Sequence, residues 1–254
     1  MSQARSVAAV IGTLATILLF WMVNPWVAVP DSLSPAITVA FWILAIGLVV
    51  VLFRDARHDA ASDRVEIEGP SFARFLFNNS RAGLVWLPIR IFLGFTWIEA
   101  GWHKATSPGW LDGGAALAGF WKGAVAVPAN GHAPITYDWY RDFINVLLQG
   151  HHETWFAVLV TYGELAIGIG LVLGALTGVA AFFGAFMNMS FLLAGSASTN
   201  PVMFTLAIGL ILAWKVAGYY GIDRILLPIL GTPWQPGSAP ALASPRPANA
   251  PTSG

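Results

Sequence analysis

Six long apolar stretches alternate with more polar segments along the chain. Each is close to the roughly 20 residues that a helix needs to cross the hydrocarbon core of a bilayer. Because backbone groups in lipid must hydrogen-bond within their own segment, the pattern predicts an all-α, polytopic membrane helix bundle with six transmembrane helices. The first stretch has an alternative interpretation as a secretory signal peptide, with Arg5 as its charged end. The stretches are Val7–Val29, Pro35–Phe53, Leu84–Trp102, Trp155–Leu173, Gly178–Gly195 and Val202–Tyr220.

The segments between the stretches divide the chain into unequal parts. The longest of them is expected to hold two short helices, Ala115–Ala126 and Tyr137–Leu148, between turns that contain Pro and Gly. The C-terminal tail is rich in Pro, Ala and Ser and is predicted to be disordered. The expected parts are two N-terminal helices at 1–53, an Arg-rich link at 54–83, a four-helix core at 84–233 with an outer segment at 105–154, and the tail at 234–254.

Charged residues are scarce and balanced. Lys+Arg and Asp+Glu number 13 each, and charged residues make up 10% of the chain. A soluble domain carries about 25%, so this composition excludes an ordinary soluble enzyme. The neutral balance also gives no basic footprint for nucleic acid. Arginines concentrate in the link at 54–83, and the positive-inside rule therefore places the link and both termini in the cytoplasm of a bacterial or archaeal plasma membrane.

Candidate metal and thiol chemistry is sparse. The chain has no Cys, which excludes disulfides, thiolate-held iron–sulfur clusters and a thiol nucleophile. Four histidines fall in or beside the outer segment, but their spacing matches no zinc template. We therefore predict no metal and no haem. These histidines are His103, His132, His151 and His152.

Ionisable residues within apolar stretches are functional candidates, because charge in a bilayer is costly. The third stretch carries Arg90 and Glu99, the fourth carries Glu164, and the fifth carries Asn188. Counted at 1.5 Å per residue, Arg90 and Glu164 fall at similar depths and are expected to pair. Such a pair either holds the bundle together or, with Asn188, lines a cavity for a polar headgroup or a proton path.

A second group of candidates lies where the third stretch meets the outer surface. Helical spacing puts Glu99 and His103 on one face, and Lys104 roughly opposite on the face of Arg90. A His–Lys pair at a membrane surface suits a small anion, and an aromatic ring such as that of Trp97 suits a quinone ring. The alternative is a tryptophan belt with a snorkelling lysine.

One spacing resembles a known family signature. Arg90, Gly94, Gly101 and Lys104 meet the pattern R-x3-[GA]-x6-G-x2-K, which resembles the first-helix signature of the DoxX family. The stretch 163–168 resembles the second signature of that family. Over residues 84–233 the chain is similar to members related to DoxD, the membrane subunit of thiosulfate:quinone oxidoreductase. The resemblance implies that the last four stretches form a four-helix membrane bundle.

The resemblance also implies a function. It is the oxidation of thiosulfate to tetrathionate with delivery of electrons to membrane quinone, normally with a second oxidoreductase subunit. The first alternative is a non-catalytic membrane module that anchors or stabilises a partner redox enzyme, and the second is a carrier of small molecules or anions. The expected site residues are Arg90, Glu99 and Glu164 as catalytic groups, His103 and Lys104 for the anion, and Trp97, Asn188 and Glu164 for the quinone.

Overall fold

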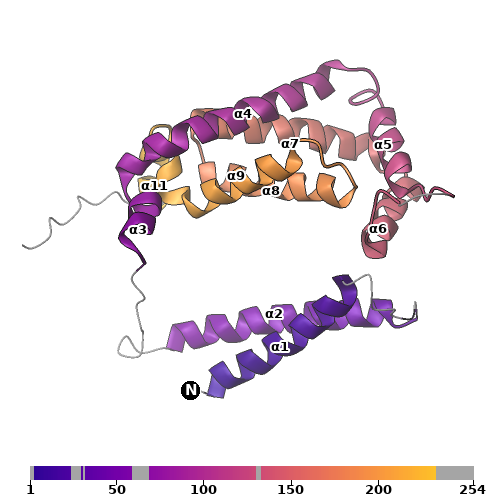
Figure 1. Cartoon of the computed structure of the whole chain (residues 1–254), viewed down its shortest axis with the longest axis horizontal. Coiled ribbons are helices and arrows are strands. Elements are labelled where there is room, and N and C mark those ends of the chain that lie inside the picture. Colours follow the sequence, from indigo (N-terminus) through magenta and orange to yellow (C-terminus); the bar gives the residue numbers. More distant parts are fainter. Residues whose placement is uncertain (1–2, 24–29, 31, 59–68, 130–132, 233–254) are drawn as a thin grey trace, which may run out of the picture.

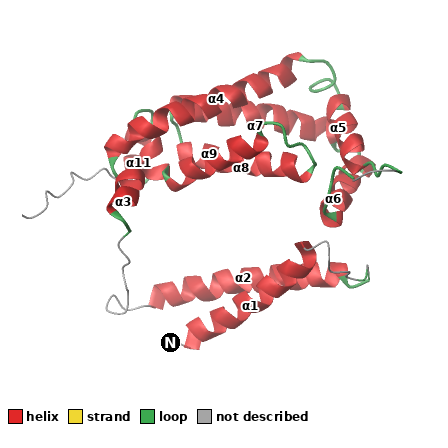
Figure 2. Ribbon diagram, viewed as in Figure 1, coloured by secondary structure: helices red, strands yellow, loops and turns green. Residues whose placement is uncertain are grey.

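All regular structure in the described part of the chain is helical (Figure 2). The computed structural model describes residues 3–23, 30, 32–58, 69–129 and 133–232. The predicted all-α class is therefore confirmed. The expected tail at 234–254 and the end of the first apolar stretch lie outside the described residues.

The first two helices form an antiparallel pair. α1 (Gln3–Val23) packs against α2 (Ser34–His58), and in Figure 1 the pair lies apart from the remaining helices. The apolar window of α2, Ser34–Val51, has none of its residues buried inside the protein. Its apolar side chains are therefore available to lipid.

Four helices run side by side as the core of the molecule (Figure 1). They are α4 (Gly83–Thr106), α7 (Glu153–Leu173), α8 (Thr177–Leu193) and α9 (Asn200–Leu212). α4 packs along α7, α7 joins α8 through a short turn, α8 packs along α9, and α9 returns to α4. This arrangement is the four-helix core that the sequence predicted.

The last predicted span is wrong in its extent. A continuous helix was expected from Val202 to Tyr220, but α9 ends at Leu212 and is followed by a separate short helix, α10 (Trp214–Ala217). The backbone leaves the helical region at Ala213, which itself is fully buried. The apolar residues of α10 turn inward and contribute Val216 and Ala217 to the bundle core instead of prolonging α9.

Short helices close the two ends of the core. At one end lie α3 (Ser71–Asn78), the 3-10 turn η2 (Ser80–Ala82) and α11 (Asp223–Ile229). At the other end α5 (Ala115–Val125) and α6 (Asp138–Gln149) form what we call the cap, close to the bounds predicted for these helices. The cap has a hydrophobic cluster of its own, which includes Leu117 and Trp121.

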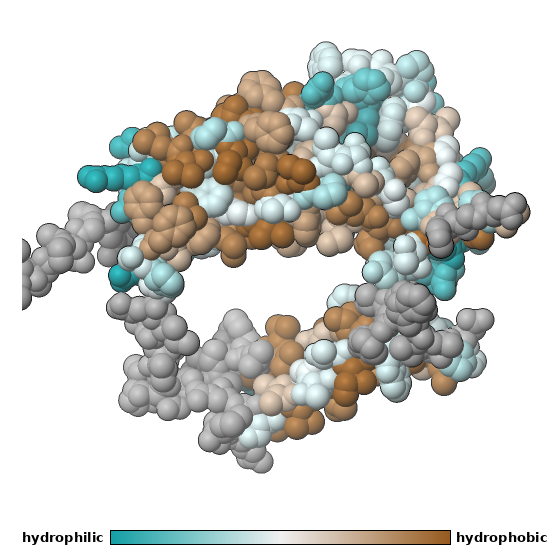
Figure 3. All heavy atoms as spheres, viewed as in Figure 1, coloured by the Kyte–Doolittle hydropathy of each residue, from teal (hydrophilic) through white to brown (hydrophobic). Residues whose placement is uncertain are grey.

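The surface of the core matches a bilayer environment. Figure 3 shows apolar side chains gathered over the helices, with hydrophilic side chains toward the ends. By length and composition, three helical segments of the described residues are long and apolar enough to cross a membrane: Ser34–Val51, Ser80–Thr106 and Glu153–Leu173. α8, α9 and most of α1 are shorter apolar helices. The chain is accordingly a multi-pass membrane protein.

Candidate functional site

Three glycines bring α4 and α7 into direct backbone contact. A Cβ on Gly168 would lie 2.7 Å from the carbonyl oxygen of Gly94 and 2.6 Å from a side-chain carbon of Ile98. A Cβ on Gly101 would lie 2.8 Å from Leu165. Small residues allow this approach between membrane helices. Two glycines of the sequence pattern, Gly94 and Gly101, therefore have a packing role.

Lys104 and Glu164 form an ion pair between these two helices. The Lys104 Nζ donates to the Glu164 Oε2 at 2.7 Å, and the two side chains are 16% and 1% exposed. The Lys104 ammonium also lies 5.2 Å from the ring centroid of Trp110, a distance that suits a cation–π contact. Lys104 thus points into the bundle rather than toward solvent.

The predicted pairing of Arg90 with Glu164 is wrong. Arg90 is 2% exposed and donates from Nη2 to the backbone carbonyl of Tyr220 at 3.1 Å. The helices are offset relative to the alignment assumed from the sequence. Leu165 faces Gly101, whereas Arg90 packs directly on Gly174, so Arg90 and Glu164 differ in depth by roughly ten residues of α7, about 15 Å.

Arg90 belongs instead to a clamp at the turn between α7 and α8. Asp223, which is fully buried, accepts hydrogen bonds from the backbone N–H groups of Leu176 (2.6 Å) and Thr177 (2.8 Å). Its own N–H donates to the carbonyl of Gly174 at 2.7 Å. Asp223 therefore caps the start of α8 from a distant part of the chain. Sequence reasoning missed this residue, although an Asp-Arg pair in an otherwise apolar run was a usable signal.

Glu99 and His103 are exposed on the other face of α4. Their separation from Lys104 agrees with the predicted helical spacing. The structure does not bring the three together, because Lys104 turns inward to Glu164 while His103 stays at the surface. An anion site built from His103 and Lys104 side by side is therefore not formed in this structure.

Trp97 and Asn188 lie inside the bundle, where they are 3% and 0% exposed. The indole nitrogen of Trp97 packs against Gly184, at 3.1 Å from the position of a Cβ there. Asn188 is one helical turn further along α8, and both polar atoms of its side chain have no hydrogen-bond partner in the described part of the chain. These two predicted residues are near one another in depth and away from the surface.

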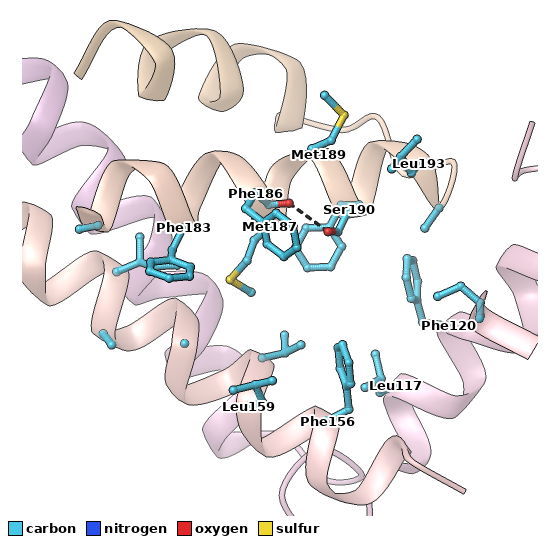
Figure 4. A pocket seen from close by; sticks show the side chains of 18 of the residues that line it. Leu117, Phe120, Phe156, Leu159, Phe183, Phe186, Met187, Met189, Ser190 and Leu193 are labelled. Atoms are coloured by element: carbon cyan, nitrogen blue, oxygen red, sulfur yellow. Dashed lines mark hydrogen bonds between the residues drawn. The ribbon is translucent and has the colours of Figure 1, made fainter. Parts of the chain in front are cut away.

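An apolar groove with a volume of about 790 Å³ lies between α7 and α8. Figure 4 shows side chains from α7, α8 and α5 converging on it. Several of its wall residues are also half exposed at the protein surface, among them Leu159, Phe183 and Phe186. None of the seven residues predicted for the site lines this groove. Its walls include Leu117, Phe120, Phe156, Leu159, Gly163, Ile167, Phe183, Phe186, Met187, Ser190 and Phe191.

Aromatic residues of the cap and of α8 close one end of the groove. The Tyr140 hydroxyl donates to the carbonyl of Ser190 at 2.9 Å, which ties α6 to α8. Burial raises the pKa of Tyr140 further above neutral pH, where a phenol is already protonated, so the hydroxyl can donate this bond. Phe191 lines the groove, and its ring centroid lies 6.0 Å from the Lys104 Nζ. The ion pair is therefore behind Phe191, adjacent to the groove.

Clusters of metal-ligating side chains are absent from the described residues. Within the described ranges, no group of three or more His, Cys, Asp or Glu side chains could hold a metal ion.

Comparison with protein families identifies one match. Residues 85–197, from α4 to the turn after α8, match the DoxX family model. This part of the chain is therefore similar to the DoxX family, in agreement with the resemblance of the first-helix signature. Comparisons with curated proteins and with solved structures found no match to the chain.

Proposed function

We propose that this DoxX-type membrane protein binds membrane quinone in the α7–α8 groove and is an oxidoreductase subunit that passes electrons to it from a small reduced sulfur compound. Thiosulfate is the first candidate donor, because of the sequence resemblance to DoxD relatives. The groove is the observation that carries the proposal. Its volume of about 790 Å³ and its apolar, aromatic wall suit an aromatic ring with a hydrocarbon tail.

The position of the groove supports a redox role at one membrane surface. The part of the groove that suits a hydrocarbon tail lies along α7 and α8, and the end lined by aromatic side chains lies under the cap. A quinone ring there would lie near Phe191 and Tyr140, with the Lys104–Glu164 pair behind Phe191. Only the thickness of one aromatic ring then separates the groove from ionisable groups.

The proposed reaction balances as two half-reactions. Two thiosulfate dianions join through a new S–S bond to give tetrathionate and release two electrons. Quinone accepts these two electrons and two protons to give quinol. Direct transfer requires the donor to bind at the cap end, close to the ring. Of the two predicted anion ligands, Lys104 lies next to Phe191, whereas His103 is exposed on the other face of α4.

The predicted catalytic residues have different standing in this proposal. Glu164 is a candidate to supply a proton to the quinone, but it must first break its ion pair with Lys104. Arg90 lies in the clamp at the opposite end of the core, away from the cap, and is better placed as a structural residue. The roles of Trp97 and Asn188 toward quinone stay predictions.

Filling the groove should abolish quinone binding. Gly163 lines the groove, and a Cβ there would meet only Met187 at 3.9 Å, so a larger side chain can enter without a backbone clash. We expect Gly163→Phe to lose most of the quinone-dependent quenching of tryptophan fluorescence in nanodiscs. The thiosulfate-driven reduction of a quinone analogue should fall by the same factor.

Ile169→Phe is the matched control, because Ile169 is on the same helix, half exposed and outside the groove lining. It should bind quinone like the wild type. If quinone quenches the fluorescence of Gly163→Phe as strongly as that of Ile169→Phe, the quinone binds outside the groove. Quenching lost in Gly163→Phe without any donor-driven reduction in the wild type would retain the groove and reject the electron donor.

A specific observation favours the alternative function, a membrane module that anchors a partner redox enzyme. Glu99 is exposed on α4 between half-exposed Phe95 and Trp102, one turn before the exposed His103. A carboxylate facing hydrocarbon is costly, and a polar group on a second subunit would remove that cost.

Glu99→Gln separates the two functions. If Glu99 anchors a partner, complexes extracted from native membranes with mild detergent should decrease in size, while quinone binding by the purified chain stays unchanged. The control is Asp142→Asn, which changes an exposed acid on the cap instead. Complexes of unchanged size in both variants would argue against an anchoring role for Glu99.

A further inference from the structure

A layer of polar side chains crosses the interior of the core, separate from the groove. It contains Thr161 and Glu164 of α7 and Asn188 of α8, which are 0%, 1% and 0% exposed, and Lys104 reaches it from α4. None of these four residues lines the groove. The layer is therefore an interior feature that lies behind the groove wall, with its Lys104–Glu164 pair next to Phe191.

Helix contacts place these side chains at neighbouring depths. Gly184 of α8 packs against Ile167 of α7, at 3.3 Å from the position of a Cβ. Asn188 and Glu164 each lie about one turn closer to the cap than these two residues. Asn188 follows Gly184 in sequence and Glu164 precedes Ile167, but both steps lead toward the cap because α7 and α8 run in opposite directions. Thr161 lies three residues from Glu164 on the same helical face.

The hydrogen-bonding capacity of the layer is only partly used. The Lys104–Glu164 pair satisfies one carboxylate oxygen. The Thr161 hydroxyl and both polar atoms of the Asn188 side chain have no partner in the described part of the chain. An unmet polar group in a low-dielectric interior is costly, and within a bilayer bulk solvent cannot supply the missing partner.

We propose that the layer is a water-binding site inside the membrane core, in which Asn188 and Thr161 hold ordered water beside the Lys104–Glu164 pair. Asn188 offers two N–H donors and a carbonyl acceptor, and Thr161 offers a hydroxyl that does both, so a water molecule can make the two to four hydrogen bonds that buried water requires. The site suits a neutral molecule, because its two charges already pair with each other.

Radiolytic labelling in ¹⁸O water tests this site in the full chain in nanodiscs, with a membrane-impermeant radical scavenger in the bulk solution. Trp97 is the internal reporter, since it is 3% exposed and one turn from the layer. Trp86 is the matched control on the same helix. It is 7% exposed, and its indole already donates to the carbonyl of Leu76. We expect Trp97 to take up label several-fold faster than Trp86.

Two near-isosteric variants show which side chains hold the water. Asn188→Leu and Thr161→Val should each reduce the labelling of Trp97 toward that of Trp86, and should leave Trp86 unchanged. Slow labelling of Trp97 in the wild type would overturn the proposal without any variant. Fast labelling that persists in both variants would also overturn it, because the water would then not depend on these two residues.

Discussion

Lys104→Met should remove most of the folded protein from the membrane fraction. The substitution leaves the Glu164 carboxylate, which is 1% exposed, without its partner at 2.7 Å. Removing one member of a buried ion pair costs about 3–5 kcal/mol, which is a large part of the stability of a typical domain. The measurement is the yield of monodisperse protein after extraction, together with the thermal unfolding midpoint.

The double variant Lys104→Met with Glu164→Gln identifies the cause. Both charges are then absent, and most of the lost stability should return, because the cost lies in the uncompensated charge rather than in the absent bond. Lys122→Met, at an exposed position of the cap, should behave like the wild type. If the double variant is as unstable as Lys104→Met, the lysine stabilises the fold by some other contact, such as that with Trp110.

Gly168→Ala should separate α4 from α7. A single Cβ at this position would approach the Gly94 carbonyl oxygen and the Ile98 backbone nitrogen to 2.7 Å, and backbone atoms cannot move aside as a flexible side chain can. Overpacking costs about 1–3 kcal/mol in well-packed cores, and Gly168→Val should cost more than Gly168→Ala. The thermal unfolding midpoint in detergent measures the loss.

Gly163→Ala is the control for the general preference of helices for alanine over glycine. Gly163 is about one turn away on the same helix, and the nearest atom to a Cβ there is the Met187 sulfur at 3.9 Å. This variant should keep or raise the unfolding midpoint, since alanine is the better helix former. Equal stability of Gly168→Ala and Gly163→Ala would contradict the close contact between α4 and α7.

Much of the fold was accessible from the sequence. Apolar length gave the bounds of α4, α7 and α8 within a few residues, and Pro- and Gly-containing turns gave α5 and α6. The end of α9 was not accessible. No proline interrupts the sequence between Val202 and Tyr220, and the departure of the backbone at Ala213 and the burial of Val216 and Ala217 depend on packing against neighbouring helices.

The candidate site was predicted less well, for a geometric reason. Residue counting gives the depth of a side chain relative to its own helix, but it does not give the offset between two helices. The contacts of Gly168 with Gly94 and Ile98 fix that offset. At this offset the partner of Glu164 is Lys104 and not the expected Arg90. Burial of Arg90, Glu164 and Asn188 was predictable, because each is too costly to leave in lipid, whereas their partners were not, and Glu99 is exposed.

The groove is bounded by the half-exposed Leu159, Phe183 and Phe186, so its opening faces sideways into the hydrocarbon and not the aqueous phase. Any occupant must first partition into the bilayer, and its effective concentration is its mole fraction among the lipids. Apparent dissociation constants will therefore rise when more detergent or lipid is added at a constant total amount of ligand. Titrations at several lipid-to-protein ratios, extrapolated on the mole-fraction scale, will give values that can be compared between variants.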